Sequence, residues 1–213
     1  MRWWILEERD TFLRTGPDAC FFKQLKPVIW EPSRRMCPEC GDLLEPAIWK
    51  APCKARVSAS ACGDLIQGAP FELVVSGAVR DAFLRDGLGG LTSFEGLATT
   101  PGLSRSYLVA RPLVALTRLD EKRSHVRWRR PPTCGRCRLG VRESVERVVI
   151  DELTWDGSDI FMASGFYGPL VVTERFVEWV GTHGFTNFRF VPSEEYSDTL
   201  GSIPKQIDDE EPT

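Results

Sequence analysis

Two Cys-x-x-Cys pairs are the residues of this sequence that are best suited to chemistry. The first has the sequence Cys-Pro-Glu-Cys over residues 37–40, and the second has Cys-Gly-Arg-Cys over residues 134–137. Cysteines at positions i and i+3 of a tight turn present both sulfur atoms to one metal ion, with backbone N–H groups pointing at the thiolates, and Pro and Gly favour such a turn. Four thiolates complete the tetrahedral coordination of Zn²⁺, so we predict a structural zinc site formed by Cys37, Cys40, Cys134 and Cys137.

Two other interpretations of the pairs stay open. A Cys-x-x-Cys pair can be a dithiol redox centre, but such a centre normally opens a helix in a β-α-β context, and neither pair does so. The pairs could also be turns that hold no metal. A catalytic zinc needs an open fourth position, which four thiolates would close. Three further cysteines belong to no motif and have no predicted role: Cys20, Cys53 and Cys62.

The distance between the pairs departs from that of compact zinc ribbons. The pairs are separated by 93 residues, against about 15 to 20 in the usual ribbon spacing. A repeat explains the distance: Leu73-Val74-Val75-Ser76 recurs as Leu170-Val171-Val172-Thr173, at an offset of 97 that the cysteine pairs share. We therefore predict an internal duplication in which each copy supplies half of the metal site near a pseudo-twofold axis.

The repeated unit is predicted to be strand, helix, strand, within a mixed α+β fold. A short apolar strand precedes Ser76 or Thr173, whose hydroxyl caps a helix of about ten residues. Gly87 or Gly184 ends the helix in a left-handed conformation, and second strands follow over 91–97 and 188–191. Further strands are expected over 3–6, 107–116 (broken by Pro112) and 145–153. We expect one domain over residues 1–213, with copies at about 30–116 and 127–192 and an acidic tail over 193–213.

The charge of the sequence is unevenly distributed. The net charge of −3 combines a basic segment, 118–147, of local net charge +6 with the tail, of local net charge −6. The basic segment includes Trp128 among arginines and resembles a nucleic-acid patch, but we favour an ordinary exposed loop before Pro131.

No secretory signal or membrane-spanning run is present, so we expect a cytoplasmic location with reduced thiols and no membrane partner. No hydrolase, phosphate-binding or metalloprotease motif occurs.

Several segments resemble the bacterial double-CXXCG motif proteins, some of which are immunity proteins of Sit-type lipoprotein toxins. The resemblance extends over nearly the whole chain, and Thr173-Glu174-Arg175-Phe176 is its most specific part. At residue 138 the sequence has Arg where the family has Gly. The other matching segments are Arg2-Trp3-Trp4-x-Leu6, Cys37-Pro38-x-Cys40-Gly41, Asp159-Ile160-Phe161, Val171-Val172, Val177-Glu178 and Gly184-Phe185.

The resemblance implies a cytoplasmic protein without catalytic activity that binds and blocks a cognate toxin domain. It does not indicate which residues contact the toxin. The alternative hypothesis is a zinc-ribbon nucleic-acid-binding or regulatory protein that uses residues 127–138.

Overall fold

The computed structural model describes residues 1–7, 22–26, 28–32, 35–57, 62–66, 71–100 and 102–199. The fold is mixed α+β, with mostly strands and two α-helices among these residues, α1 (Gly77–Arg85) and α2 (Glu174–His183). The strands are β1 (Trp3–Leu6), β2 (Phe22–Gln24), β3 (Trp30–Glu31), β4 (Ile48–Trp49), β5 (Cys53–Val57), β6 (Leu65–Ile66), β7 (Leu73–Ser76), β8 (Leu91–Thr100), β9 (Tyr107–Arg118), β10 (Arg127–Arg130), β11 (Val141–Val145), β12 (Ile160–Ser164), β13 (Phe166–Thr173), β14 (Phe190–Pro192) and β15 (Asp198–Thr199). Two 3₁₀ turns are η1 (Glu152–Thr154) and η2 (Ser193–Glu195).

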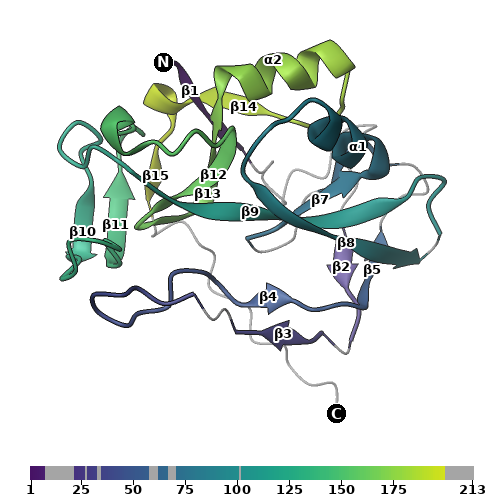
Figure 1. Ribbon diagram of the computed structural model, residues 1–213, viewed down its shortest axis with the longest axis horizontal. Helices are drawn as coiled ribbons and strands as arrows, with labels where there is room; N and C mark the ends of the chain where they lie inside the picture. Colours follow the sequence, from purple (N-terminus) through teal and green to yellow (C-terminus); the bar gives the residue numbers. More distant parts are fainter. Residues whose placement is uncertain are drawn as a thin grey trace.

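One large sheet organises the molecule. Its strands run in the order β14-β1-β13-β12-β9-β8-β5-β2, and β7 pairs with both β6 and β9. The two helices lie together above this sheet in Figure 1. The small hairpin β3–β4 lies below the sheet, and the hairpin β10–β11 lies at its left end. The β10–β11 hairpin is extended by β15 into a separate three-stranded sheet.

Apolar residues cover both faces of the large sheet. On the helix side, Val79 and Phe83 of α1 and Phe176 of α2 pack with alternate strand residues such as Val172. On the opposite face, a second cluster forms around Phe161. A strand that is buried on both faces of a sheet needs apolar residues at consecutive positions. The Leu-Val-Val triplets of β7 and β13 meet this requirement.

Most of the predicted elements are formed. Ser76 and Thr173 are the N-caps of α1 and α2, and each side chain accepts a hydrogen bond from the backbone N–H three residues later. Gly87 and Gly184 have φ angles of 65° and 64°. These positive values are the left-handed conformation that a glycine at a helix end provides without steric cost.

Strand β9 is not broken at Pro112, contrary to the sequence-based prediction. Pairing with β7 ends at Ala110, and pairing with β12 begins at Leu113. On the other edge, Pro112 lies opposite Leu91, next to a register shift in β8. Pro112 therefore lies where the hydrogen-bond ladder is irregular on both edges of β9. Its missing N–H interrupts no regular pairing, so the strand continues.

Two further expectations differ from the structure. The strand expected over 145–153 is not formed, because β11 ends at Val145 and Asp151 instead caps the turn η1 through the backbone N–H of Leu153. The first residues of the expected acidic tail belong to the fold, since η2 and β15 lie within 193–199 and β15 pairs with β11. The remainder of the tail lies outside the described residues.

Candidate metal centre

The structure brings the four predicted cysteines together in one cluster. The sulfur atoms of Cys37 and Cys134 are 3.8 Å apart, and those of Cys40 and Cys137 are 3.6 Å apart. All four sulfur atoms lie within 4.8 Å of one another, so the cluster could hold a metal ion. A tetrahedral site with metal–sulfur bonds of about 2.3 Å has sulfur atoms about 3.8 Å apart, whereas a disulfide requires about 2.05 Å. The spacing therefore fits a tetrahedral ion and not two disulfides.

Each cysteine pair lies in the connection of a β-hairpin. The first knuckle, which we define as residues 37–41, lies between β3 and β4, and the second knuckle, residues 134–138, lies between β10 and β11. The two have matching backbone hydrogen bonds, from the N–H of Gly41 to the carbonyl of Cys37 and from the N–H of Arg138 to the carbonyl of Cys134. Two hairpin ends thus meet at the four sulfur atoms.

The environment of the sulfur atoms differs between ligands. The backbone N–H of Cys40 lowers the pKa of the Cys37 thiol to about 7. In the same turn, burial and hydrogen bonds with neighbouring thiols and Asp42 raise the pKa of the Cys40 thiol, so without an ion the turn does not favour two thiolates. Burial raises the pKa of the Cys137 thiol, whose residue is only 1% exposed. A divalent cation would favour the thiolate form of all three, because it replaces the protons with a larger positive charge.

Carboxylates lie on the exposed side of the cluster. The thiol of Cys40 donates to Asp42 at 3.3 Å, and the thiol of Cys134 donates to Glu39 at 3.6 Å. A metal-bound thiolate has no proton to donate, so ion binding would break these two hydrogen bonds. The carboxylates add no ligand that is needed for a tetrahedral ion.

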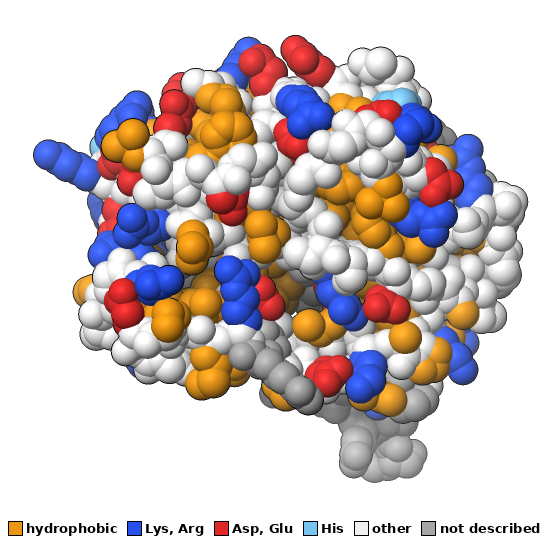
Figure 2. Space-filling model, in the orientation of Figure 1, with side chains coloured by type: hydrophobic (Ala, Val, Ile, Leu, Met, Phe, Trp, Pro, Cys, Tyr) orange, Lys and Arg blue, Asp and Glu red, His pale blue; other side chains and the backbone are white. Residues whose placement is uncertain are grey.

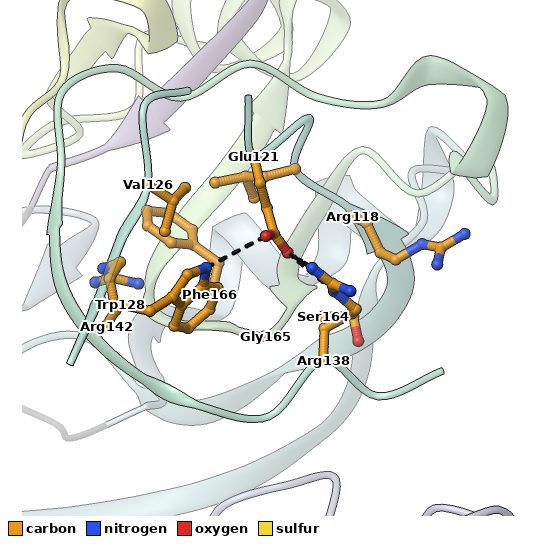
Figure 3. A pocket seen from close by; sticks show the side chains of 10 residues that line it. Arg118, Glu121, Val126, Trp128, Arg138, Arg142, Ser164, Gly165 and Phe166 are labelled. Carbon is orange, nitrogen blue, oxygen red and sulfur yellow. Dashed lines mark hydrogen bonds and ion pairs between the residues drawn. The ribbon is translucent and has the colours of Figure 1, made fainter. Parts of the chain in front are cut away.

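A left-handed residue ends each knuckle. Gly41 has φ 77°, and Arg138, at the matching position of the second knuckle, has φ 54°. Arg138 can therefore keep the backbone of the first knuckle although it is not a glycine. Its guanidinium forms an ion pair with Glu121, which also accepts a hydrogen bond from the indole of Trp128, as Figure 3 shows.

The second knuckle packs directly on the large sheet. The hydroxyl of Ser164 donates to the carbonyl of Cys137 at 2.9 Å, and Gly165 lies so close that a Cβ on it would be 2.5 Å from the Arg138 carbonyl.

The hairpin that carries the first knuckle is attached to the large sheet by two hydrogen bonds outside the knuckle itself. The hydroxyl of Tyr167 donates to the carbonyl of Leu44 at 2.9 Å, and the guanidinium of Arg35 donates to the carbonyl of Val114 at 2.9 Å. These anchoring residues could not be identified from the sequence, since no local motif marks them.

The other two described cysteines, Cys53 and Cys62, are not part of the cluster. Cys53 is buried in β5, and its pKa is raised to about 11 by that burial. Cys62 is disulfide-bonded, which departs from the expectation that all thiols are reduced. Cys20 lies outside the described residues.

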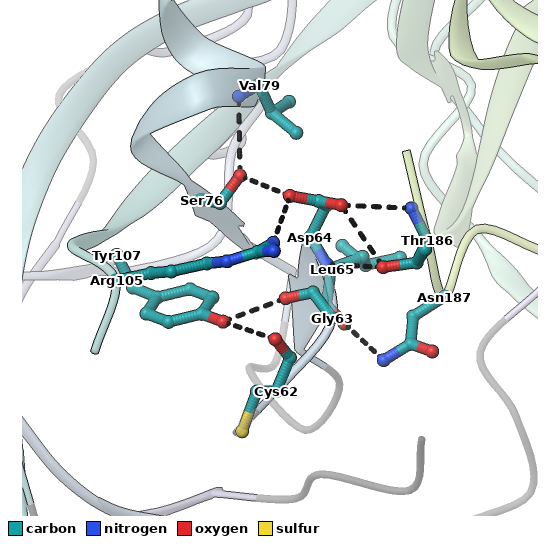
Figure 4. Close-up of polar contacts among 10 residues, drawn as sticks. All are labelled: Cys62, Gly63, Asp64, Leu65, Ser76, Val79, Arg105, Tyr107, Thr186 and Asn187. Atoms are coloured by element: carbon teal, nitrogen blue, oxygen red, sulfur yellow. Dashed lines mark hydrogen bonds and ion pairs between the residues drawn. The ribbon is translucent and has the colours of Figure 1, made fainter. Parts of the chain in front are cut away.

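Two buried aspartates hold the residues that begin the two helices. Asp64 accepts hydrogen bonds from Ser76, Arg105 and Thr186, as Figure 4 shows. In the other half, Asp159 accepts them from Thr173, Arg175 and the backbone N–H of Gly89. Each aspartate thus holds the N-cap residue of one helix.

No family model matches this chain, and no curated protein matches its sequence. Neither helix among the described residues is long and apolar enough to cross a membrane.

Proposed function

We propose that the protein is a non-enzymatic binding protein whose two hairpins are joined by one structural zinc ion. The observation that supports this is the four-sulfur cluster: its tetrahedral spacing fits Zn²⁺, and four thiolates leave no position for a substrate. Soft sulfur ligands in a tetrahedral set favour zinc over magnesium or calcium. When bound, the ion would supply a rigid link between the knuckles and no chemistry on a substrate.

Metal analysis tests the zinc. We expect the purified protein to contain about one zinc per chain, and the fourfold cysteine-to-serine variant at residues 37, 40, 134 and 137 to contain none. Cys53→Ala is the matched control, because Cys53 is a buried thiol outside the cluster, and it should keep its zinc. A folded wild-type protein without metal would contradict the proposal.

The proposal includes an internal duplication, which contacts between equivalent positions support. Near a twofold axis, equivalent positions touch each other. The pairs Cys37–Cys134 and Cys40–Cys137 are both 97 residues apart, and so is the pair Asp86–His183, in contact at 2.8 Å. Hydrogen bonds from Arg85, Trp179 and His183 also lower the pKa of Asp86 to about 2.

Strand pairing supports the same duplication. Strand β9 pairs with β7 before α1 and with β8 after it. In the second half, β1 pairs with β13 before α2 and with β14 after it. Strand β1 therefore has the same position relative to α2 that β9 has relative to α1, as a duplication predicts.

Matched substitutions test the equivalence of the halves. Asp64→Ala and Asp159→Ala should each lower the free energy of unfolding by about 3 kcal/mol, because each leaves a buried N-cap hydroxyl and a backbone donor without their acceptor. Urea unfolding of both variants measures this. A large effect at one site and none at the other would count against equivalent roles.

As its biological role, we propose immunity: the protein binds one cognate toxin domain and occludes it stoichiometrically. The support is the resemblance of its sequence segments to the double-CXXCG motif proteins. The most specific of these segments has a place in the fold, since Thr173 caps α2, Arg175 contacts Asp159 and Phe176 is buried. The residues that contact a toxin are therefore to be sought elsewhere on the surface.

The neighbouring reading frame provides the test of immunity. We expect it to encode a lipoprotein toxin whose purified toxic domain forms a one-to-one complex with this protein. Co-expression should protect cells from that domain. The absence of such a neighbour, or a neighbour whose toxic domain does not bind, would contradict the proposed role.

A further inference from the structure

The β10–β11 hairpin forms a basic flank of the molecule. In Figure 1 it lies at the left end of the fold, and Figure 2 shows Lys and Arg side chains gathered along that side, with acidic ones among them. Arg127, Arg129 and Arg130 of β10 are all exposed. We call these three residues the arginine row.

The arginine row has no ion-pair partner among the described residues, unlike its neighbours. Arg138 is paired with Glu121, and Arg142 with Asp198 at 2.7 Å. These paired arginines hold the hairpin in place, whereas the row forms no ion pair with the described residues, and Arg127 acts on nearby Glu146 through its charge alone. Unused arginines on a fixed element are a common feature of interfaces, where Arg is enriched among the residues that dominate binding.

The hairpin that presents the row is attached to the rest of the fold at two points. Arg142 of β11 is 8% exposed and lies over the ring of Phe166, 4.3 Å from its centroid, so it attaches the hairpin to the large sheet. In the connection between β10 and β11, the second knuckle belongs to the four-sulfur cluster. A surface that is already fixed loses little conformational entropy on binding.

The composition of this surface favours a protein partner over nucleic acid. Glu143 and Glu146 are exposed on the same hairpin and would face phosphates unfavourably. Val141, which is 38% exposed, lies directly opposite Arg130. The indole of Trp128 is bonded to Glu121 and packs in the pocket of Figure 3, so it is not free to stack on a base.

We propose that the arginine row is the docking surface for an acidic face of the toxin domain, a proposal that rests on the proposed immunity role. The three guanidiniums would pair with carboxylates of the partner, and Val141, which lies opposite Arg130, would supply apolar contact at that end of the row. Because the rim of such a surface is charged, association should be faster at low salt and should slow as salt rises.

Charge reversal tests the surface with the purified toxic domain of the neighbouring reading frame as the probe. We expect Arg127→Glu/Arg129→Glu/Arg130→Glu to weaken binding by about a hundredfold, mainly through slower association. The neutral variant with Gln at the same three positions should weaken it by about tenfold and retains the shape of the surface. Lys54→Glu/Arg56→Glu is the matched control, since both residues are exposed on β5, and it should bind within about twofold of wild type.

The outcomes are distinguishable. Zinc content and urea unfolding identify a variant that fails to fold. If the glutamate variant fails to fold, the toxin affinity of the glutamine variant is the test of the docking surface. If wild type binds the domain and both row variants bind it equally well, the docking surface is wrong and the immunity role stands. If wild type does not bind the domain, the immunity role is wrong and the docking proposal falls with it. In a further outcome, wild type binds a DNA duplex or an RNA hairpin tightly and in a salt-sensitive way, while both row variants lose that binding and keep toxin binding. That outcome would make the row a nucleic-acid surface and overturn the proposal.

Discussion

The two knuckles share a backbone conformation that ends in a left-handed residue, but different interactions stabilise it in each. The first ends at Gly41, with φ 77° and open space around the position where a Cβ would lie. The second ends at Arg138, which has φ 54°, is paired with Glu121 and lies against Gly165. A left-handed conformation costs a residue other than glycine roughly 1 to 2 kcal/mol.

The difference shows where each turn derives its conformation. The first knuckle is specified locally, by a glycine that adopts positive φ without strain. The second is specified by its surroundings: the contacts of Arg138 with Glu121 and of Cys137 with Ser164 offset the strain. Substitutions around the second knuckle should therefore act through packing, and those in the first through the backbone alone.

Loss of a buried ligand should have the largest effect and should act equally on both knuckles. Cys37→Ser and Cys137→Ser each remove one thiolate from the cluster, so both variants should lose the metal and more than about 4 kcal/mol of the free energy of unfolding. Metal analysis and thermal unfolding measure this. If either variant kept its metal and its stability, the two knuckles would not share one ion.

Gly165→Ala should have the next largest effect. The new Cβ would lie 2.5 Å from the Arg138 carbonyl at a position of φ 74°, so the second knuckle must move. We expect a loss of about 3 kcal/mol, from overpacking and left-handed strain together, measured by urea unfolding.

Gly168→Ala is the matched control for Gly165→Ala. Gly168 also has positive φ, 109°, but no atom beyond its chain neighbours lies within 4 Å of the place that a Cβ would take. The variant should lose only the strain energy, about 1 to 2 kcal/mol. Equal losses at residues 165 and 168 would show that packing against the knuckle is not the cause.

Gly41→Ala should cost about 1 kcal/mol, with the metal retained. The added methyl group meets nothing within 4 Å, so only the left-handed backbone opposes it. Titration with a competing chelator and urea unfolding are the measurements. A loss as large as that of Gly165→Ala would mean that the first knuckle is packed as tightly as the second.

Arg138→Gly should have the smallest effect, within about 1 kcal/mol of wild type. Relief of the left-handed strain, about 1 kcal/mol, is opposed by loss of the ion pair with Glu121, of similar size. Glu121→Gln removes the ion pair but keeps the strain, so it should be less stable than Arg138→Gly. The opposite order would show that the ion pair, and not the turn, dominates at this position.

Local sequence patterns predicted the elements that depend on near neighbours. The hydroxyl residues Ser76 and Thr173 marked the helix starts, and the glycines after both helices marked their ends. The apolar triplets marked β7 and β13 because burial on both sheet faces requires continuous apolar residues. The spacing within and between the cysteine pairs indicated one shared site, and the four sulfur atoms do lie together.

Features that depend on distant neighbours could not be predicted in this way. Pro112 normally ends a strand, yet β9 continues through it because neither adjoining ladder is regular at that residue. The apolar residues over 145–153 suggested a strand, but the chain instead turns at Asp151. Nothing in the sequence near Ser164 indicated its hydrogen bond to Cys137.

The sequence by itself determined the cysteines of the cluster, the helix caps and the apolar strands, because turn chemistry, capping and burial periodicity act over a few residues. Only the tertiary structure decided that β1 completes the second half of the sheet and that Arg138 can replace a glycine. It also decided that the arginine row stays unpaired among the described residues while Arg142 is buried. These outcomes depend on which distant surfaces meet, and a residue's immediate neighbours in the sequence do not specify that.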